Sequence, residues 1–248
     1  MEPFLSLQIN LLDMARTIKI DNALQKRFAK QAKESRSREL VTYFLIVCEG
    51  EKTEPNYFKS FPKKVGKFIY DVEFEGGGIS TQKVVEKAIE LRDKSKQKYD
   101  RVWAVFDKDS FTPNSFNSAI LKAKANNISC AWSNEAFELW YLLHFHNRVT
   151  AMRRAEYEKA IEEAINERLG KNRKQFKYKK NDTGMYLLIN RIGDQTSAIK
   201  WAKDLSKSID GEQFANSNPQ TMVFKLVEEL NGQSEELNAE LNEKYAES

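Results

Sequence analysis

The chain has 248 residues, of which 41% are hydrophobic and 31% are charged, and its formal net charge is +4. This composition excludes a disordered chain, and no apolar run approaches the roughly 18 to 20 residues that a membrane span needs. Cys48 and Cys130 both lie in apolar runs, which argues against a disulfide or a zinc site, and the first residues lack a signal-peptide pattern, so we expect a cytoplasmic protein.

The chain begins with a basic segment, residues 1–39, that we expect to be helical. Residues 16–38 hold eight Lys or Arg against Asp21 and Glu34. A run of one charge is most often a solvated helix face. We therefore separate this segment from the folded core that follows it.

Residues 40–146 alternate between strand and helix patterns. Strands are expected at the apolar or alternating runs 41–48, 68–74, 101–106 and 128–133. Helices are expected at 54–64, 81–97, 115–127 and 134–145, with Thr81 as an N-cap. This alternation predicts an α/β fold with a mostly parallel sheet, right-handed crossovers and flanking helices.

The remainder, residues 147–248, forms a helical C-terminal region with little strand signal. Helices are expected near 153–168, 183–209 with a break at Gly193, and 219–231. The tail from Glu228 to Ser248 holds seven Glu against one Lys. We expect this acidic tail to be a solvated face, with docking of the basic stretch at residues 168–180 as the alternative.

A basic stretch at residues 168–180, RLGKNRKQFKYKK, joins the first two of these helices. It holds seven basic residues, no acidic residue, and two interleaved aromatic rings. Lysines can meet phosphates while bases stack on rings, so the stretch is either a nucleic-acid contact or a solvated loop. The candidate nucleic-acid-binding residues are Lys171, Arg173, Lys174, Lys177, Tyr178, Lys179 and Lys180.

Acidic residues crowd the ends of two predicted strands. Glu49 follows the first strand, whereas Asp107 and Asp109 follow the third. In extended backbone, residues i and i+2 face the same side, so the two aspartates are expected to converge. Sites in parallel sheets form at the carboxyl ends of strands, and carboxylates this close need a cation. Oxygen ligands alone favour Mg²⁺ or Mn²⁺ over zinc.

Four stretches carry a family resemblance: VCEGEKTEPNYFKSF, VFDKDSF, SNEAFELWYLLHF and NPQTMVFKLVEEL. They closely resemble the RloB-like proteins of bacterial phage-resistance systems, which look like members of the Toprim superfamily. The resemblance covers about residues 41–231. The Toprim pattern asks for a Glu after the first strand and D-x-D after a later one, which Glu49, Asp107 and Asp109 match. Glu51 and Glu54 crowd the same first loop, and either can share or replace the role of Glu49.

The resemblance implies a Mg²⁺- or Mn²⁺-dependent endonuclease that is the effector of an abortive-infection system. It also implies an ATPase partner encoded nearby, because the chain has no Walker motif of its own. We expect RNA or tRNA as the substrate in preference to DNA, no membrane, and a homo-oligomer as one possible state. A non-catalytic subunit that binds nucleic acid or a partner stays open as the alternative, and polymerase-like nucleotidyl transfer is a third.

Other residues near these motifs have two interpretations each. Lys52 and Lys108 either face a phosphate or balance the neighbouring acids. Glu138 is a possible additional metal ligand, whereas His144 reads as a packed histidine more than as a general base. The glycines at 76–78 lack the G-K-[ST] of a P-loop and are read as a strand-to-helix turn.

Overall fold

The structure is a computed structural model that describes residues 40–66, 68–76, 81–109, 111–170 and 174–246. The expected basic segment 1–39 lies outside these residues, and Glu39–Ser248 forms one compact unit. In chain order the elements are β1 (Leu40–Cys48), α2 (Thr53–Lys59), β2 (Lys64–Val65), β3 (Phe68–Gly76), α3 (Thr81–Lys94), β4 (Arg101–Asp107), α4 (Pro113–Ala125), β5 (Ser129–Ser133), α5 (Glu138–Leu143), α6 (Arg154–Leu169), α7 (Met185–Ile192), α8 (Gln195–Ser206), a 3₁₀ turn η1 (Phe214–Asn216), α9 (Val223–Leu230) and α10 (Glu235–Ala246).

A five-stranded sheet in the order β2-β3-β1-β4-β5 forms the centre of the protein. β1 pairs in parallel with β3 and β4, and β4 pairs in parallel with β5. β2 pairs antiparallel with β3 over two residues only. The predicted mixed α/β fold with a mostly parallel sheet is confirmed, and among the described strands the short edge strand β2 was not predicted.

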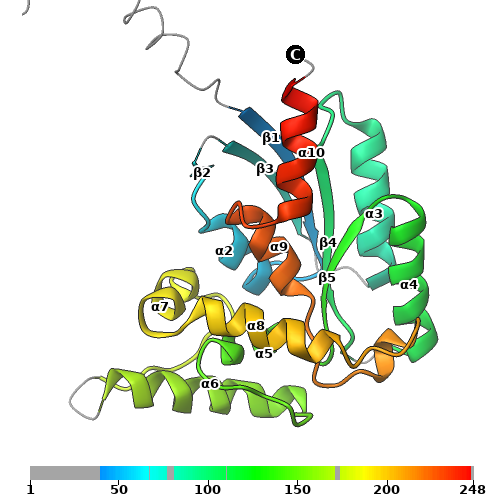
Figure 1. The fold of residues 1–248 in the computed structure, drawn as a ribbon. Helices are drawn as coiled ribbons and strands as arrows, with labels where there is room; N and C mark the ends of the chain where they lie inside the picture. The colour runs from blue at the N-terminus through cyan, green and yellow to red at the C-terminus, as the bar shows by residue number, and fades with distance from the viewer. Residues whose placement is uncertain (1–39, 67, 77–80, 110, 171–173, 247–248) are drawn as a thin grey trace, which may run out of the picture. The chain divides into compact units, whose positions relative to one another are not determined.

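The sheet is covered on both faces, which explains the continuous apolar runs. Along β1, Phe44 and Ile46 pack in one core cluster, whereas Leu45 and Val47 pack in the other. The first cluster includes side chains of α2, α5 and α9, and the second includes those of α3 and α4 (Figure 1). Because successive side chains of a strand point to opposite faces, the central strands β1 and β4 are apolar along most of their length, whereas β3 carries acidic residues at partly exposed positions.

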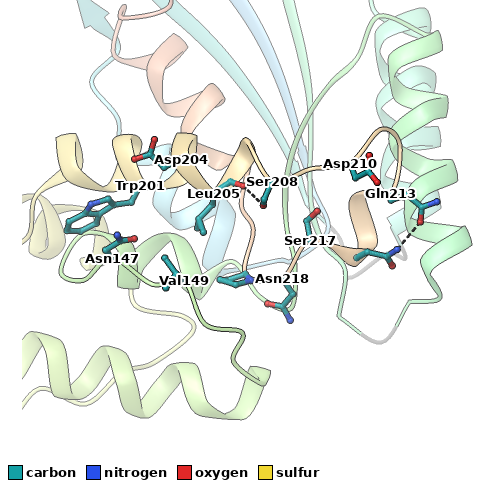
Figure 2. A pocket seen from close by; sticks show the side chains of 12 residues that line it. Asn147, Val149, Trp201, Asp204, Leu205, Ser208, Asp210, Gln213, Ser217 and Asn218 are labelled. Atoms are coloured by element: carbon teal, nitrogen blue, oxygen red, sulfur yellow. Dashed lines mark hydrogen bonds between the residues drawn. The ribbon is translucent and has the colours of Figure 1, made fainter.

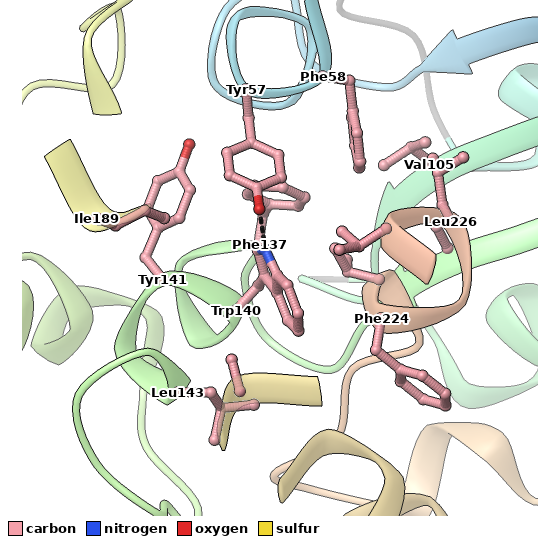
Figure 3. Packing of buried hydrophobic residues seen from close by; sticks show 14 of the residues in the cluster. Tyr57, Phe58, Val105, Phe137, Trp140, Tyr141, Leu143, Ile189, Phe224 and Leu226 are labelled. Carbon is pink, nitrogen blue, oxygen red and sulfur yellow. Dashed lines mark hydrogen bonds between the residues drawn. The ribbon is translucent and has the colours of Figure 1, made fainter. Parts of the chain in front are cut away.

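An aromatic cluster fixes α2 and α5 against each other (Figure 3). The Trp140 indole Nε1–H donates a hydrogen bond to the Tyr57 hydroxyl at 2.8 Å. The Tyr57 ring also packs edge-on to Phe137, with 5.6 Å between centroids. Packed aromatic pairs with a satisfied polar atom make a rigid contact. The two helices therefore hold Glu54 and Glu138, which lie in their first turns, in fixed positions.

The helix expected at 134–145 is shorter in the structure, because α5 begins only at Glu138. Glu135 has a left-handed backbone with φ 74°, which a helix cannot continue through. The Asn134 side chain also donates to the carbonyls of Ala215 and Ser217, which holds this loop against the C-terminal region.

The predicted break at Gly193 is confirmed, since α7 ends at Ile192 and α8 begins at Gln195. A Cβ on Gly193 would lie 2.7 Å from the carbonyl oxygen of Ile189 and 2.9 Å from the Cβ of His144. Only glycine fits this contact. Helices from both sides of residue 146 share the first core cluster, so the C-terminal region packs directly on the α/β core.

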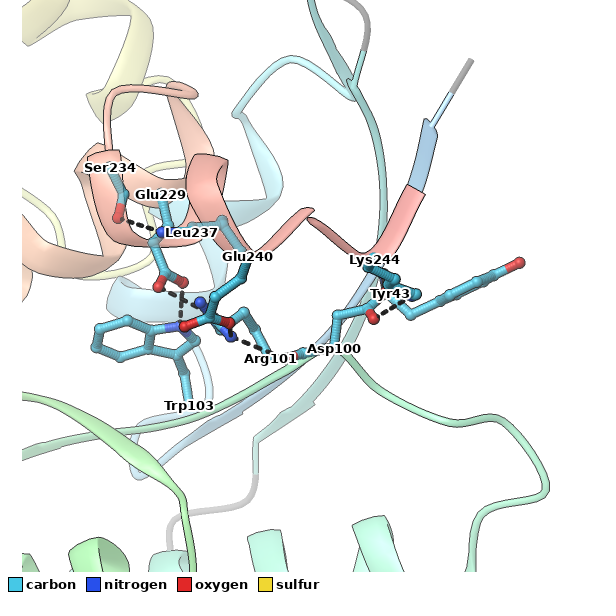
Figure 4. A network of polar contacts seen from close by, with 9 residues as sticks. All are labelled: Tyr43, Asp100, Arg101, Trp103, Glu229, Ser234, Leu237, Glu240 and Lys244. Atoms are coloured by element: carbon cyan, nitrogen blue, oxygen red, sulfur yellow. Dashed lines mark hydrogen bonds and ion pairs between the residues drawn. The ribbon is translucent and has the colours of Figure 1, made fainter. Parts of the chain in front are cut away.

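The acidic tail forms a helix, α10, that the sequence reading did not predict. Leu237 and Leu241, one turn apart, are buried against the core. The Arg101 guanidinium, at the start of β4, makes ion pairs with Glu229 at 3.0 Å and with Glu240 at 2.7 Å (Figure 4). The tail therefore binds the amino end of β4. Within the residues that the structure describes, no helix is long and apolar enough to cross a membrane.

Candidate active site

The carboxyl ends of β1 and β4 lie side by side and bring the predicted acids together. Cys48, the last residue of β1, is opposite Val105 of β4. The Glu49 N–H donates to the Val105 carbonyl at 2.8 Å, and the Asp107 N–H donates to Glu49 Oε2 at 3.0 Å. The chain leaves β1 toward α2 on one face and leaves β4 toward α4 on the other. This is a topological switch point, where parallel α/β sheets place ligands.

Three carboxylates are buried at this point. Asp107, Glu54 and Glu138 are 5%, 6% and 3% exposed, respectively. They line a pocket of about 330 Å³ together with the 50–53 loop. A Cβ on Gly50 would lie only 2.3 Å from Glu54 Oε2, so the glycine backbone leaves room for the carboxylate. Glu54 and Glu138 therefore belong to the candidate site together with Asp107.

Burial raises the pKa values of three acids at the site, Glu49, Glu54 and Asp107. Desolvation raises the pKa of Glu54 to about 7, and the charge of Glu138 adds to the effect. Desolvation likewise raises the pKa of Glu49 to about 7, although the hydrogen bond from Asp107 N–H opposes it. The pKa of Asp107 is raised by its burial and then by the charges of Glu54 and Glu138. The site therefore favours an additional cation over its present state.

Asp109 does not sit as the extended-backbone argument expected. β4 ends at Asp107, and Asp109 has a left-handed backbone with φ 39°. Its Oδ2 lies 2.8 Å from a terminal nitrogen of Arg154, and the same nitrogen lies 3.9 Å from Asp107 Oδ2. The two aspartates therefore meet at one arginine, which the sequence reading missed. Nothing in the local sequence marks Arg154, since it enters the site from α6.

The residues of the first loop differ from Glu54 in their exposure to solvent. Glu51 and Lys52 are both exposed at the pocket mouth, whereas Glu54 is buried within it. Of the three candidate glutamates, Glu54 is buried within the pocket and Glu51 is exposed on its lining, whereas Glu49 lies beside the pocket, half-buried at the end of β1. Thr81, expected as an N-cap, is instead the first residue of α3, and its hydroxyl donates to the Asp107 carbonyl at 3.4 Å.

Residues 174–180 of the basic stretch are anchored beside the site rather than forming a free loop. Lys177 pairs with Glu162 of α6 at 2.8 Å. The carbonyls of Lys180 and Asn181 accept hydrogen bonds from the side chains of Thr53 and Asn56 on α2. Lys180 also lines the acid pocket. Residues 174–181, hereafter the strap, therefore connect α6 to α2 beside the acids.

Tyr178 is buried in the strap, so the prediction that a nucleic-acid base stacks on its ring is wrong. The side chain is 8% exposed and packs near Tyr141. Its hydroxyl donates to Glu138 Oε1 at 2.8 Å. Lys174, Lys179 and Lys180 are exposed and remain candidate phosphate contacts, whereas Lys171 and Arg173 lie outside the described residues.

His144 is a packed histidine, as the sequence favoured. It is 1% exposed, and its Nδ1 lies 2.9 Å from the Trp140 carbonyl oxygen. Burial lowers the pKa of His144 to about 4, so the ring is neutral at physiological pH. It lines no part of the acid pocket.

A larger pocket of about 710 Å³ lies elsewhere, between α8 and the 208–219 loop (Figure 2). Trp201, Asn147 and Asn218 line it with other amides and hydroxyls. It shares no lining residue with the acid pocket. The larger pocket therefore contains none of the three buried acids, Asp107, Glu54 and Glu138, which line the smaller one.

The acid pocket has donors of the right kind for a hard divalent cation. Glu54, Asp107 and Glu138 in the pocket and Glu49 beside it supply oxygen atoms only, as Mg²⁺ and Mn²⁺ prefer. Within the described residues, no three acidic, histidine or cysteine side chains are already arranged as a metal site. The pKa values of Glu49, Glu54 and Asp107 are raised chiefly by desolvation, and a cation at the pocket would favour the charged forms of these carboxylates.

The comparisons with known proteins give one finding. A family model described as RloB-like protein matches residues 44–230, which is 187 of the 248 residues. No curated protein and no solved structure matches the chain. The matched range runs from β1 to the end of α9 and so includes the whole acid pocket and the strap.

Proposed function

We infer a function from the premise that the chain belongs to the RloB-like family. The protein is a Mg²⁺- or Mn²⁺-dependent endonuclease with a Toprim-like core. It cuts RNA, with tRNA as the preferred candidate, and serves as the effector of a bacterial anti-phage abortive-infection system with an ATPase partner. One observation carries the catalytic part: buried, under-neutralised carboxylates converge at the switch point of a parallel sheet.

The protein's own residues divide the work of phosphodiester cleavage. Glu49, Glu54 and Asp107 would hold the metal, with Glu138 as a fourth oxygen donor. When bound, the metal supplies charge neutralisation at the phosphate and a more acidic water. The hydrogen bond from Asp107 N–H to Glu49 and that from Tyr178 to Glu138 hold two of these carboxylates in place.

Cations at the pocket supply the complementary half of the site. Lys52, Lys180 and Arg154 line it on three different segments, the first loop, the strap and the start of α6. Positive groups fixed beside a phosphate stabilise the charge that develops on its oxygens during cleavage. The exposed Lys174 and Lys179 extend positive charge along the strap, where the nucleic-acid backbone would run.

The test uses purified full-length protein and labelled tRNA, single-stranded RNA, single-stranded DNA and duplex DNA, with Mg²⁺, Mn²⁺ or EDTA. We expect cleavage of an RNA with metal and none with EDTA. Asp107→Asn should abolish cleavage, whereas Glu51→Gln, a matched change at an exposed acid of the same site, should retain it. Equal cleavage by Asp107→Asn and the wild type would overturn the assignment. Binding of intact substrate in every arm would favour the non-catalytic subunit.

A further inference from the structure

Arg154 is the pocket cation that makes ion pairs with Asp107 and Asp109. Its guanidinium lies 2.8 Å from Asp109 Oδ2 and 3.9 Å from Asp107 Oδ2. Burial alone would lower the pKa of Arg154, but the charges of Asp107 and Asp109 and then those of Glu138 and Glu54 raise it. The arginine thus neutralises part of the same charge that a divalent ion would neutralise.

Two residues with unusual backbone conformations each place an oxygen atom beside the Arg154 guanidinium. Asp109 and Glu135 both adopt left-handed φ values, 39° and 74°, although neither is a glycine. Asp109 offers its carboxylate to Arg154, and Glu135 offers its carbonyl oxygen at 3.4 Å. Such conformations cost free energy and persist where surrounding contacts enforce them. Both strained residues therefore present an oxygen to the same arginine, at the edge of the pocket.

The Arg154 guanidinium is nevertheless only partly buried. The Arg154 side chain is 38% exposed, whereas Asp107 is almost fully buried. Its long stem starts from the first turn of α6, so the charged end can swing toward solvent without moving a core residue. A divalent ion bound to Asp107 would lie within a few ångströms of the present guanidinium position. Like charges at that separation repel strongly inside a protein.

We propose that Arg154 is a resident counter-cation of the acid pocket, which a divalent metal must displace from Asp107 and Asp109 before the site is loaded. This inference rests on the proposed metal-dependent function and adds a residue that sets metal affinity. Arg154 weakens metal binding by competition and at the same time keeps the metal-free acids from repelling one another. Once displaced, its charge remains at the pocket edge, where a substrate phosphate would lie.

Metal binding measured without catalysis tests this directly. The free Mn²⁺ signal is followed by electron paramagnetic resonance during titration of the full chain without nucleic acid. Arg154→Gln removes the competing charge, so we expect Mn²⁺ to bind about tenfold more tightly or better. Arg154→Lys keeps the charge and should stay close to the wild type. Arg153→Gln, the same charge change at the exposed neighbouring residue, should have little effect.

Each outcome decides the matter. Tighter binding by Arg154→Gln alone supports displacement, and so does Mn²⁺ binding that appears in this variant when the wild type binds none. Equal or weaker binding by Arg154→Gln overturns the proposal, and so does the absence of binding in both proteins. If Arg154→Gln does not fold, the NMR signal of the Arg154 side-chain Nε–H in the wild type decides. That signal should shift on saturation with Mg²⁺, and an unchanged signal overturns displacement.

The outcome is separable from that of the nuclease assay. Equal Mn²⁺ affinities alongside metal-dependent RNA cleavage would remove the role of Arg154 and leave the proposed function standing. Tighter Mn²⁺ binding by Arg154→Gln without cleavage of any substrate would support the role of Arg154 and remove the proposed nuclease function.

Discussion

Replacing Glu54 by glutamine should stabilise the metal-free protein at alkaline pH and leave it unchanged at acidic pH. The Glu54 carboxylate is 6% exposed and faces Asp107 and Glu138 across the pocket. Glutamine has nearly the same shape and never ionises. The substitution therefore removes the buried charge and retains most of the packing.

The sign follows from the pKa. Burial raises the pKa of Glu54 from its ordinary value of 4.5 to about 7 in the folded protein. A raised folded-state pKa means that the carboxyl stabilises the fold fully below about pH 4.5, and that this contribution is lost as the pH rises through about 7. Full loss corresponds to at most about 3 kcal/mol. Relaxation of the side chains around Glu54 reduces this loss. We therefore expect Glu54→Gln to gain about 2 kcal/mol in free energy of unfolding at pH 8, which corresponds to about 4–8 °C in Tm.

The assay is denaturant unfolding in EDTA at pH 5 and pH 8, with Glu51→Gln as the matched control. Glu51 is exposed and three residues earlier in the same loop, so its removal changes the same charge without changing a buried group. Glu54→Gln should gain much more stability over the wild type at pH 8 than at pH 5, and Mg²⁺ should reverse the ranking at pH 8. An equal gain at pH 5 and pH 8, or an equal gain for both variants, would refute the reasoning.

Three further outcomes can be measured. Tyr178→Phe should keep the fold but raise the Mg²⁺ concentration needed for half-maximal thermal stabilisation, because the Glu138 carboxylate loses a hydrogen-bond donor; an unchanged midpoint contradicts this. Arg101→Gln should cost about 3 kcal/mol in urea unfolding, because it leaves the largely buried Glu229 carboxylate without its cation; a loss below about 0.5 kcal/mol would show that the pair contributes little. Replacing Lys174 and Lys179 by glutamine should lower the salt dependence of single-stranded RNA binding by about 0.7 per lost contact, and an equal slope means that neither meets phosphate.

The sequence predicts the sheet and the two acids at its edge for a clear physical reason. Parallel strands covered on both faces must be apolar throughout, so β1 and β4 stand out as runs that end at Glu49 and Asp107. The glycine break between α7 and α8 was equally visible. The two-residue strand β2 was not, because two residues carry no periodicity.

The roles of Tyr178 and Arg154 were hidden because tertiary contacts decide them. An aromatic ring between lysines looks like a stacking platform, but side chains of α6 capture the strap backbone around it. Asn166 binds both backbone groups of Phe176, and a Glu162 carboxylate accepts the Tyr178 N–H. These contacts join residues 10 to 16 positions apart, a separation at which no local pattern is detectable. Helix α10 in the acidic tail, by contrast, was predictable from local sequence, because Leu237 and Leu241, four residues apart, mark a buried helix face.

The two ends of β4 show why burial of acids alone does not identify a site. At its amino end, both oxygens of the Glu229 carboxylate have donors, Arg101 Nε at 3.0 Å and Trp103 Nε1 at 2.8 Å (Figure 4). Burial still raises the pKa of Glu229, but a guanidinium in direct contact opposes it. At the carboxyl end, Asp107 is buried with acidic neighbours, and its nearest cation, Arg154, is shared with Asp109 and partly exposed. The amino end is therefore a completed structural ion pair, whereas the carboxyl end is short of positive charge and suited to receive a metal ion and a phosphate.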